Sequence, residues 1–66
     1  MILSEKIIML RKKYGWSQEE LAERLDISRQ SVSKWETGTS DPSTSNLIAL
    51  AKLFKISPEE LLSEVS

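Results

Sequence analysis

Serine residues suited to helix capping recur along this 66-residue chain, each before a short segment whose apolar residues are three or four positions apart. Ser17 and Ser57 are each followed three positions later by a glutamate, which is the pattern of a capping box. Pro58 stands at the first helical position, where its missing N–H costs nothing. The other serines that precede such segments are Ser4, Ser28 and Ser43. These signals restrict the chain to several short helices.

The spacing of the apolar residues predicts the order of the helices. We expect a first helix that ends at Gly15 in the left-handed conformation, helices over residues 17–25 and 28–37, and two more that begin after Ser43 and Ser57. No segment alternates between apolar and polar residues, so we expect no sheet. The predicted fold class is all-α, a compact bundle of five short helices. The positions expected to face the core are Leu3, Ile7, Leu10, Tyr14, Leu21, Ala22, Leu25, Ile27, Val32, Trp35, Leu47, Leu50, Ala51, Phe54, Leu61 and Leu62.

Several classes of function lack the residues that they need. Cysteine and histidine are absent, which removes disulfides, thiolate nucleophiles, the commonest metal ligand and the commonest general base. The paired glutamates at 19–20 and 59–60 each lie in the first turn of a predicted helix, where acids interact favourably with the helix dipole. The longest apolar run is five residues, far short of the roughly 18 that span a bilayer. We therefore expect no enzyme, no metal or cofactor site, no bound small molecule and no membrane association.

The charge of the chain is small in total and uneven in distribution. A chain of this length forms one domain at most, which we place over residues 1–66. Its net charge of −1 argues against nucleic acid, because nucleic-acid-binding domains are usually basic. However, residues 1–35 carry seven basic and five acidic side chains, whereas residues 36–66 carry two basic and five acidic ones. The first half is therefore mildly basic and the second half acidic.

Residues 17–37 have the proportions of a helix-turn-helix, two short helices joined by a three-residue turn. The exposed positions of the second helix carry Arg29, Gln30, Ser33 and Lys34, with no acid among them. Arginine can bind guanine and glutamine can bind adenine through two hydrogen bonds, and lysine can contact guanine or phosphate. A helix in the major groove presents its N-terminal residues, and those one turn later, to the bases. We therefore predict Arg29, Gln30 and Lys34 as base-contacting residues, although such a face can also be simply solvated.

Other residues allow a purely structural interpretation. Trp16 and Trp35 are expected in the core or at its edge rather than as platforms for stacking bases. Arg11 and Glu36 could form an ordinary surface ion pair, worth under about 1 kcal/mol.

Many spaced positions together resemble the lambdoid phage repressor and Cro group, the xenobiotic-response-element (XRE) type regulators of bacteria. The resemblance covers residues 3–63. The residues that carry it are Trp16–Ala22, Leu25–Ser28, Val32–Glu36, Gly38, Pro42–Ser43, Leu47, Leu50–Ala51, Ile56–Pro58 and Leu61–Leu62.

The resemblance implies a role for individual residues. Helix 28–37 would be the recognition helix, with Arg29, Gln30 and Lys34 at the family's base-contacting positions. Gln18 would bind a DNA phosphate, helped by the positive end of its helix. Arg11 and Glu36 match positions that form a buried ion pair in related repressors. The residues that would touch or approach the DNA backbone are Ser31, Ser33, Thr37, Thr39 and Ser40.

Two positions depart from the family's pattern. Asp26 stands where glycine is common because the turn tends to need a positive φ; aspartate tolerates that region better than most residues, so we expect only modest strain. The loop after Gly38 reads Thr39-Ser40-Asp41, where relatives often have lysine or arginine. Fewer cations predict weaker non-specific binding and a smaller dependence of affinity on salt.

The residues and the resemblance together predict a sequence-specific transcriptional regulator, a repressor rather than an activator, that binds double-stranded DNA in the bacterial cytoplasm as part of the nucleoid. We expect a homodimer on an inverted repeat. The acidic C-terminal helices, with Leu61, Leu62 and Val65, could provide the dimer surface or merely pack in the core. A longer natural chain with a C-terminal sensing or dimerising domain is compatible with this expectation.

The alternative is a protein-interaction module on the same fold, such as an antitoxin or a coactivator-like bridge. The net acidity and the poorly basic loop favour it, and the acid-free face of helix 28–37 argues against it.

Overall fold

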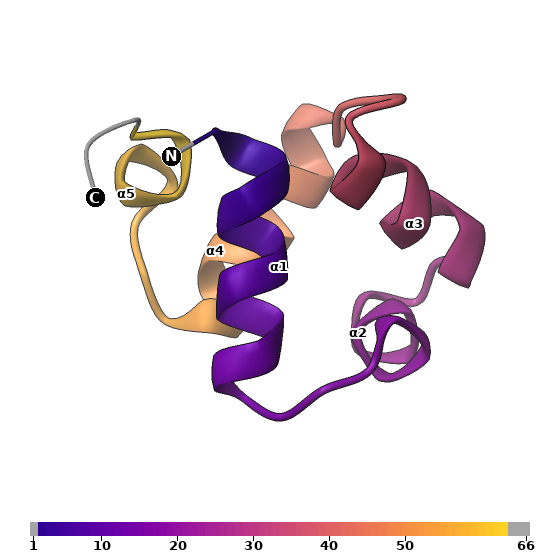
Figure 1. The fold of residues 1–66 in the computed structure, drawn as a ribbon. Helices are drawn as coiled ribbons and strands as arrows, with labels where there is room; N and C mark the ends of the chain where they lie inside the picture. The colour runs from indigo at the N-terminus through magenta and orange to yellow at the C-terminus, as the bar shows by residue number, and fades with distance from the viewer. Residues whose placement is uncertain (1, 64–66) are drawn as a thin grey trace.

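The computed structural model describes residues 2–63, and within them it contains five helices and no strand. The Cα radius of gyration is 10.5 Å, close to the roughly 11 Å of a compact domain of this length. The predicted all-α class is therefore confirmed. None of the described helices is both long and apolar enough to cross a membrane. In chain order the helices are α1 (Leu3–Lys13), α2 (Gln18–Leu25), α3 (Arg29–Thr37), α4 (Thr44–Phe54) and α5 (Pro58–Leu62) (Figure 1).

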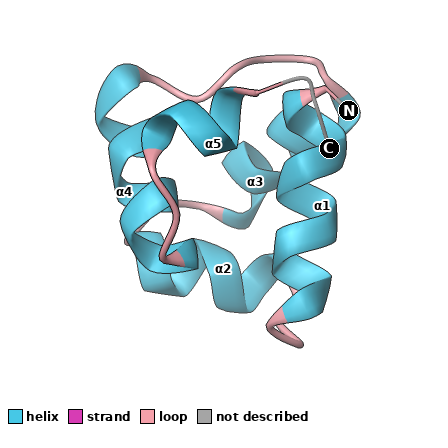
Figure 2. Ribbon diagram, turned by 90° about the vertical axis from the view of Figure 1, so that its left-hand side faces the viewer, coloured by secondary structure: helices cyan, strands magenta, loops and turns pink. Residues whose placement is uncertain are grey.

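Helix α1 runs through the middle of the molecule. Helices α2 and α3 pack against each other on one side of it, and α5 lies on the other side (Figure 1). In the view turned by 90°, the long connection from α3 to α4 passes over one end of the bundle (Figure 2). The arrangement leaves α3 at the edge, where none of the other described helices covers its outer face (Figure 1).

Serine side chains cap four of the five helices, as predicted. The hydroxyl oxygens of Ser17, Ser28, Ser43 and Ser57 each accept a hydrogen bond from the backbone N–H three residues later, over 3.0 to 3.3 Å. The prediction was wrong at Ser4, which lies inside α1. The helix begins instead after Ile2, whose side chain makes no capping hydrogen bond and whose N–H donates to the Glu5 carboxylate over 3.3 Å.

Residues in the left-handed conformation follow four of the helices. Gly15 and Gly38 have φ of 74° and 77°, a region open to glycine because it lacks a Cβ. Asp26 has φ of 58°, so the turn does require the positive φ expected there. Lys55 has φ of 59°, and no sequence signal predicted a left-handed residue at that position.

The core is formed by ten apolar side chains, and two predicted core residues lie outside it. Leu62 is 52% exposed, because it follows the fully buried Leu61 by one position and a short helix cannot turn both inward. Tyr14 is 37% exposed and lies at the edge of the core. Its hydroxyl donates to the Phe54 carbonyl over 2.9 Å. The buried apolar residues are Ile7, Leu10, Leu21, Ala22, Val32, Trp35, Leu50, Ala51, Phe54 and Leu61. Predicted residues that are partly buried against them are Leu3, Leu25, Ile27 and Leu47.

The two tryptophans have the structural roles expected of them. Trp35 is buried in the core. Trp16 lies at the core edge, where its ring stacks on Tyr14 with centroids 4.8 Å apart and the Arg24 guanidinium lies 4.3 Å from its centroid.

A buried lysine joins the first and last helices. The Lys6 ammonium group donates to the backbone carbonyl oxygens of Glu60 and Ser63, the latter over 2.9 Å. These carbonyls lie at and just beyond the C-terminal end of α5, and the Glu60 carbonyl also accepts from the Ser63 N–H over 3.3 Å. Lys6 therefore caps α5 from α1, a contact that the sequence analysis did not identify.

Candidate nucleic-acid interface

Helix α3 exposes the side chains that the sequence singled out. Val32 and Trp35 are buried and hold one face of the helix against the core. Arg29, Gln30 and Lys34 lie on the opposite, exposed side, and no acid lies among them. The outer face of α3 can therefore present two cations and an amide to a ligand without any rearrangement of the helices.

The turn before α3 sets where the helix begins. Asp26 ends α2 in the left-handed conformation, and Ile27 packs against the core. The Ser28 hydroxyl then accepts from the Ser31 N–H over 3.3 Å and lies 3.1 Å from the Ser31 hydroxyl. Arg29 is consequently the first residue of α3, at the exposed N-terminal end of the helix.

Arg11 and Glu36 form an ion pair that joins α1 to the end of α3. The Arg11 Nε donates to Glu36 Oε2 over 2.6 Å, and a terminal nitrogen donates to Oε1 over 3.0 Å. The remaining terminal nitrogen donates to the Trp16 carbonyl over 2.8 Å. The side chains are only 12% and 5% exposed, so the surface-pair interpretation does not hold. The hydrogen bond to Glu36 and the charge of its carboxylate raise the pKa of Arg11, although burial opposes the shift.

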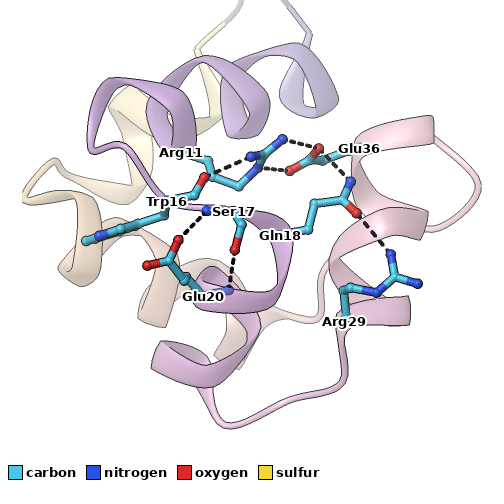
Figure 3. A network of polar contacts seen from close by, with 7 residues as sticks. All are labelled: Arg11, Trp16, Ser17, Gln18, Glu20, Arg29 and Glu36. Atoms are coloured by element: carbon cyan, nitrogen blue, oxygen red, sulfur yellow. Dashed lines mark hydrogen bonds and ion pairs between the residues drawn. The ribbon is translucent and has the colours of Figure 1, made fainter.

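Gln18, predicted as a phosphate contact, is already bonded at both ends of its amide. Its Nε2 donates to Glu36 Oε1 over 3.0 Å, and its Oε1 accepts from a terminal nitrogen of Arg29 over 3.3 Å (Figure 3). A continuous chain of polar contacts thus runs from Arg11 through Glu36 and Gln18 to Arg29. The resemblance implied the Arg11–Glu36 pair, whereas sequence reasoning missed the contacts of Gln18 with Glu36 and Arg29, because nothing in the spacing of these residues indicates that they meet.

The first turn of α2 lies beside Gln18 and is closed by a capping box. The Ser17 hydroxyl accepts from the Glu20 N–H, and the Glu20 carboxylate accepts from the Ser17 N–H over 2.9 Å. These bonds from the backbone and the hydroxyl of Ser17 lower the pKa of Glu20. The two acids of this turn, Glu19 and Glu20, lie close to the end of α2 that would approach a phosphate.

The loop that follows α3 is held mainly by the carbonyl oxygen of Lys34. It accepts from the backbone N–H groups of Thr39 and Ser40 over 2.9 and 3.3 Å, and from the Thr37 hydroxyl over 3.2 Å. The hydroxyls of Thr37 and Thr39 also lie 2.8 Å apart. Because those N–H groups are occupied, contact with DNA here would depend on side-chain hydroxyls.

Ser33 is half-buried on α3, between the core and the outer face.

A comparison with protein families assigns the whole arrangement. The family model described as Helix-turn-helix matches residues 7–61 of this chain. The chain belongs to the helix-turn-helix family. The expected resemblance to the lambdoid repressors is confirmed as well, because the chain superposes on the crystal structure of the Salmonella phage P22 c2 repressor in complex with a synthetic operator. That match has a TM-score of 0.88 and 33% sequence identity, and it covers 96% of each chain.

Two curated relatives are longer helix-turn-helix proteins. The transcriptional regulator DicA of Escherichia coli (strain K12) is 42% identical over 62 residues, which are 94% of this chain and 46% of DicA. The transcriptional activator BcrR of Enterococcus faecalis is 41% identical over 63 residues, which are 96% of this chain and 31% of BcrR. The chain therefore spans about a third to a half of these relatives.

Within this helix-turn-helix domain, the predicted motif at residues 17–37 coincides with α2, the turn at Asp26 and α3. Among the residues that the structure describes, no group of three or more carboxylate, histidine or cysteine side chains could hold a metal ion.

Proposed function

We propose that this helix-turn-helix chain binds double-stranded DNA in a sequence-specific manner and acts as the DNA-binding part of a bacterial transcriptional regulator. The observation that carries the proposal is the acid-free outer face of α3, with Arg29, Gln30 and Lys34 exposed and the helix held from behind by two buried residues. The P22 c2 repressor, whose fold this chain shares along its length, is seen with a synthetic operator.

In this proposal α3 enters the major groove. Arg29 and Gln30, at the start of the helix, and Lys34, one turn later, contact base edges. Gln18 donates its second Nε2 hydrogen to a phosphate beside the positive end of α2. Hydroxyl groups of α3 and the following loop approach the DNA backbone; they belong to Ser31, Ser33, Thr37, Thr39 and Ser40.

We further propose a homodimer that binds an inverted repeat, acting as a repressor in the cytoplasm on the bacterial nucleoid. The α5 surface supports this choice, because Leu62 is 52% exposed there, although Leu61, which was expected on the same surface, is fully buried in the core. Val65, the third residue expected on this surface, lies outside the described residues. Two half-sites about one helical turn apart would then be bound by two copies of α3.

Selection from a randomised library of DNA duplexes at moderate salt tests the proposal. Enrichment of an inverted repeat supports a dimeric, sequence-specific regulator. Enrichment of a single half-site supports sequence-specific DNA binding and contradicts a dimer of this chain. Absence of enrichment, with the chain shown to be folded by circular dichroism, contradicts DNA recognition.

The second candidate is the protein-interaction module, an antitoxin or a coactivator-like bridge, which the lack of cations in the loop at residues 39–41 favours. The variant Arg29→Glu separates the two functions. It should abolish DNA binding under the first proposal, whereas a partner that binds elsewhere would still be bound.

A further inference from the structure

The chain of contacts that ends at Arg29 begins in the interior of the domain. Arg11 and Glu36 are largely buried, Gln18 is half-buried, and Arg29 is exposed (Figure 3). The four residues come from three helices: Arg11 from α1, Gln18 from the start of α2, and Glu36 and Arg29 from the two ends of α3. The network therefore connects the last turn of α3 to its first residue through α2 rather than along the helix itself.

The chemistry of the carboxylate fixes the orientation of the Gln18 amide. An ionised carboxylate only accepts hydrogen bonds, so Glu36 can be faced by the NH₂ end of Gln18 but not by its oxygen. Arg29 only donates, so it can be faced by the Gln18 oxygen but not by the NH₂ end. Glu36 and Arg29 thus require the same orientation of the amide, and each contact supports the other.

This contact restrains one end of the Arg29 guanidinium and leaves the rest of it free. Only one of its five N–H donors is directed to Gln18, so a pair of donors remains for the two acceptors of a guanine. Arginine is a long side chain that otherwise populates many rotamers, and the Gln18 oxygen is its one hydrogen-bond partner among the residues that the structure describes. In contrast, neither Gln30 nor Lys34 makes a side-chain hydrogen bond to any described residue.

We infer that Glu36 is a positioning residue for DNA recognition, acting through the Gln18 amide to orient Arg29. This inference rests on the proposed function. It implies that the preference for one base pair, the pair that Arg29 contacts, depends on a carboxylate buried at the other end of α3. It also adds to the role of Gln18, because a phosphate contact alone would affect all DNA sequences equally.

The variants Gln18→Met and Glu36→Gln test this inference in the full 66-residue chain. Gln18→Met removes the amide and leaves both hydrogen bonds between Arg11 and Glu36 intact, so the fold is preserved. The probes are the selected operator and two derivatives of it. The first derivative is changed at the base pair for which Arg29→Ala loses its preference. The second is changed at the base pair for which Lys34→Ala loses its preference. The measured quantity is the ratio of dissociation constants between a derivative and the operator.

We expect each variant to lower the ratio for the Arg29 base pair about threefold or more and to leave the ratio for the Lys34 base pair unchanged. In the double variant, Glu36→Gln should cause no further loss, because the amide that connects it to Arg29 is already absent. The control is Lys6→Met, which weakens the fold far from the network and should change neither ratio. Every variant is measured at a temperature where circular dichroism shows it folded.

The outcomes separate the inference from the function on which it rests. If the unmodified chain selects no sequence, the proposed function fails. If it selects a sequence and the ratio for the Arg29 base pair is unchanged in Gln18→Met, the positioning role fails alone. Equal losses at both base pairs, or additive losses in the double variant, would also overturn it, since they indicate a general structural effect.

Discussion

Asp26 and Lys55 have almost the same backbone conformation, with φ of 58° and 59°, one residue beyond the ends of α2 and α4. Their surroundings match as well. The residue that follows each of them, Ile27 or Ile56, donates its N–H over 3.0 Å to a carbonyl of the helix and packs against the core. Both helices therefore end in the same motif, in which a left-handed residue is followed by an apolar one.

The two positions should nevertheless respond differently to glycine. Lysine has no side-chain means of easing the left-handed conformation, so Lys55→Gly should raise the free energy of unfolding by about 1 kcal/mol. Asp26→Gly should raise the free energy of unfolding by less, because aspartate tolerates the left-handed conformation better than lysine does. Urea unfolding of the two variants and the parent chain measures both differences, and an equal gain at the two sites would contradict this explanation.

The ammonium group of Lys6 should contribute to stability through its bonds to the end of α5. Lys6→Met keeps the length of the side chain and removes the charged donor, so we expect a loss of about 1–3 kcal/mol. Lys12→Met, on the exposed side of the same helix, should stay within about 0.5 kcal/mol of the parent. Thermal unfolding compares them, and similar midpoints for both variants would refute the capping role.

Breaking the Arg11–Glu36 pair from one side should be far more costly than replacing both residues. Arg11→Met leaves the buried Glu36 carboxylate without its cation, at an expected cost of about 3–5 kcal/mol. A domain of this size has only about 3–10 kcal/mol to lose, so much of the protein should unfold. The double variant Arg11→Met/Glu36→Leu should recover a large part of the loss, as measured by urea unfolding; a double variant as unstable as the single one would argue against a stranded charge.

The capping box of α2 should make a pH-dependent contribution to stability. Its Ser17 partner lowers the pKa of Glu20 below the ordinary value of 4.5. The contribution is therefore complete above that value and is lost as the pH falls through the lowered pKa. Glu20→Gln keeps a side chain that can complete the box but cannot titrate. The free energy of unfolding, measured by urea at several values between about pH 7 and pH 3, should fall less for Glu20→Gln than for the parent chain.

The free side chains of α3 should each determine one base pair. Gln30→Ala and Lys34→Ala should cost about 1–3 kcal/mol of binding to the selected operator and relax the preference at a single position. Repeating the DNA selection with each variant measures this effect. A preference unchanged in Gln30→Ala would show that the DNA-contacting face of α3 has been assigned incorrectly.

The helix starts could be predicted because the signals for them are local. Ser17, Ser28, Ser43 and Ser57 each bond to an N–H three residues away, so a short stretch of sequence contains both partners. The inward residues followed from helical spacing for the same reason. Errors arose where local spacing does not determine which residues are buried. Leu62 satisfies the apolar pattern but belongs to a helix that is too short to bury it.

The polar network could not be predicted from spacing, because its members are far apart in the chain. Arg11 and Glu36 are 25 positions apart and Gln18 and Glu36 are 18 apart, so only the packing of α1, α2 and α3 brings them together. The resemblance to repressors suggested the first of these contacts, whereas the contacts of Gln18 with Glu36 and Arg29 required the structure. Lys6 is similar, since its partners lie more than 50 residues away.

The difference between Arg29 and its neighbours on α3 bears on how proteins of this kind diverge. Gln30 and Lys34 make no side-chain hydrogen bond to a described residue, so mutations there alter the outer surface and leave the bonds between helices intact. Under the proposed function, a duplicated gene could acquire a new target sequence through these two codons without a loss of folding. Position 29 is less free, because a replacement must also suit the Gln18 oxygen and, behind it, the buried pair.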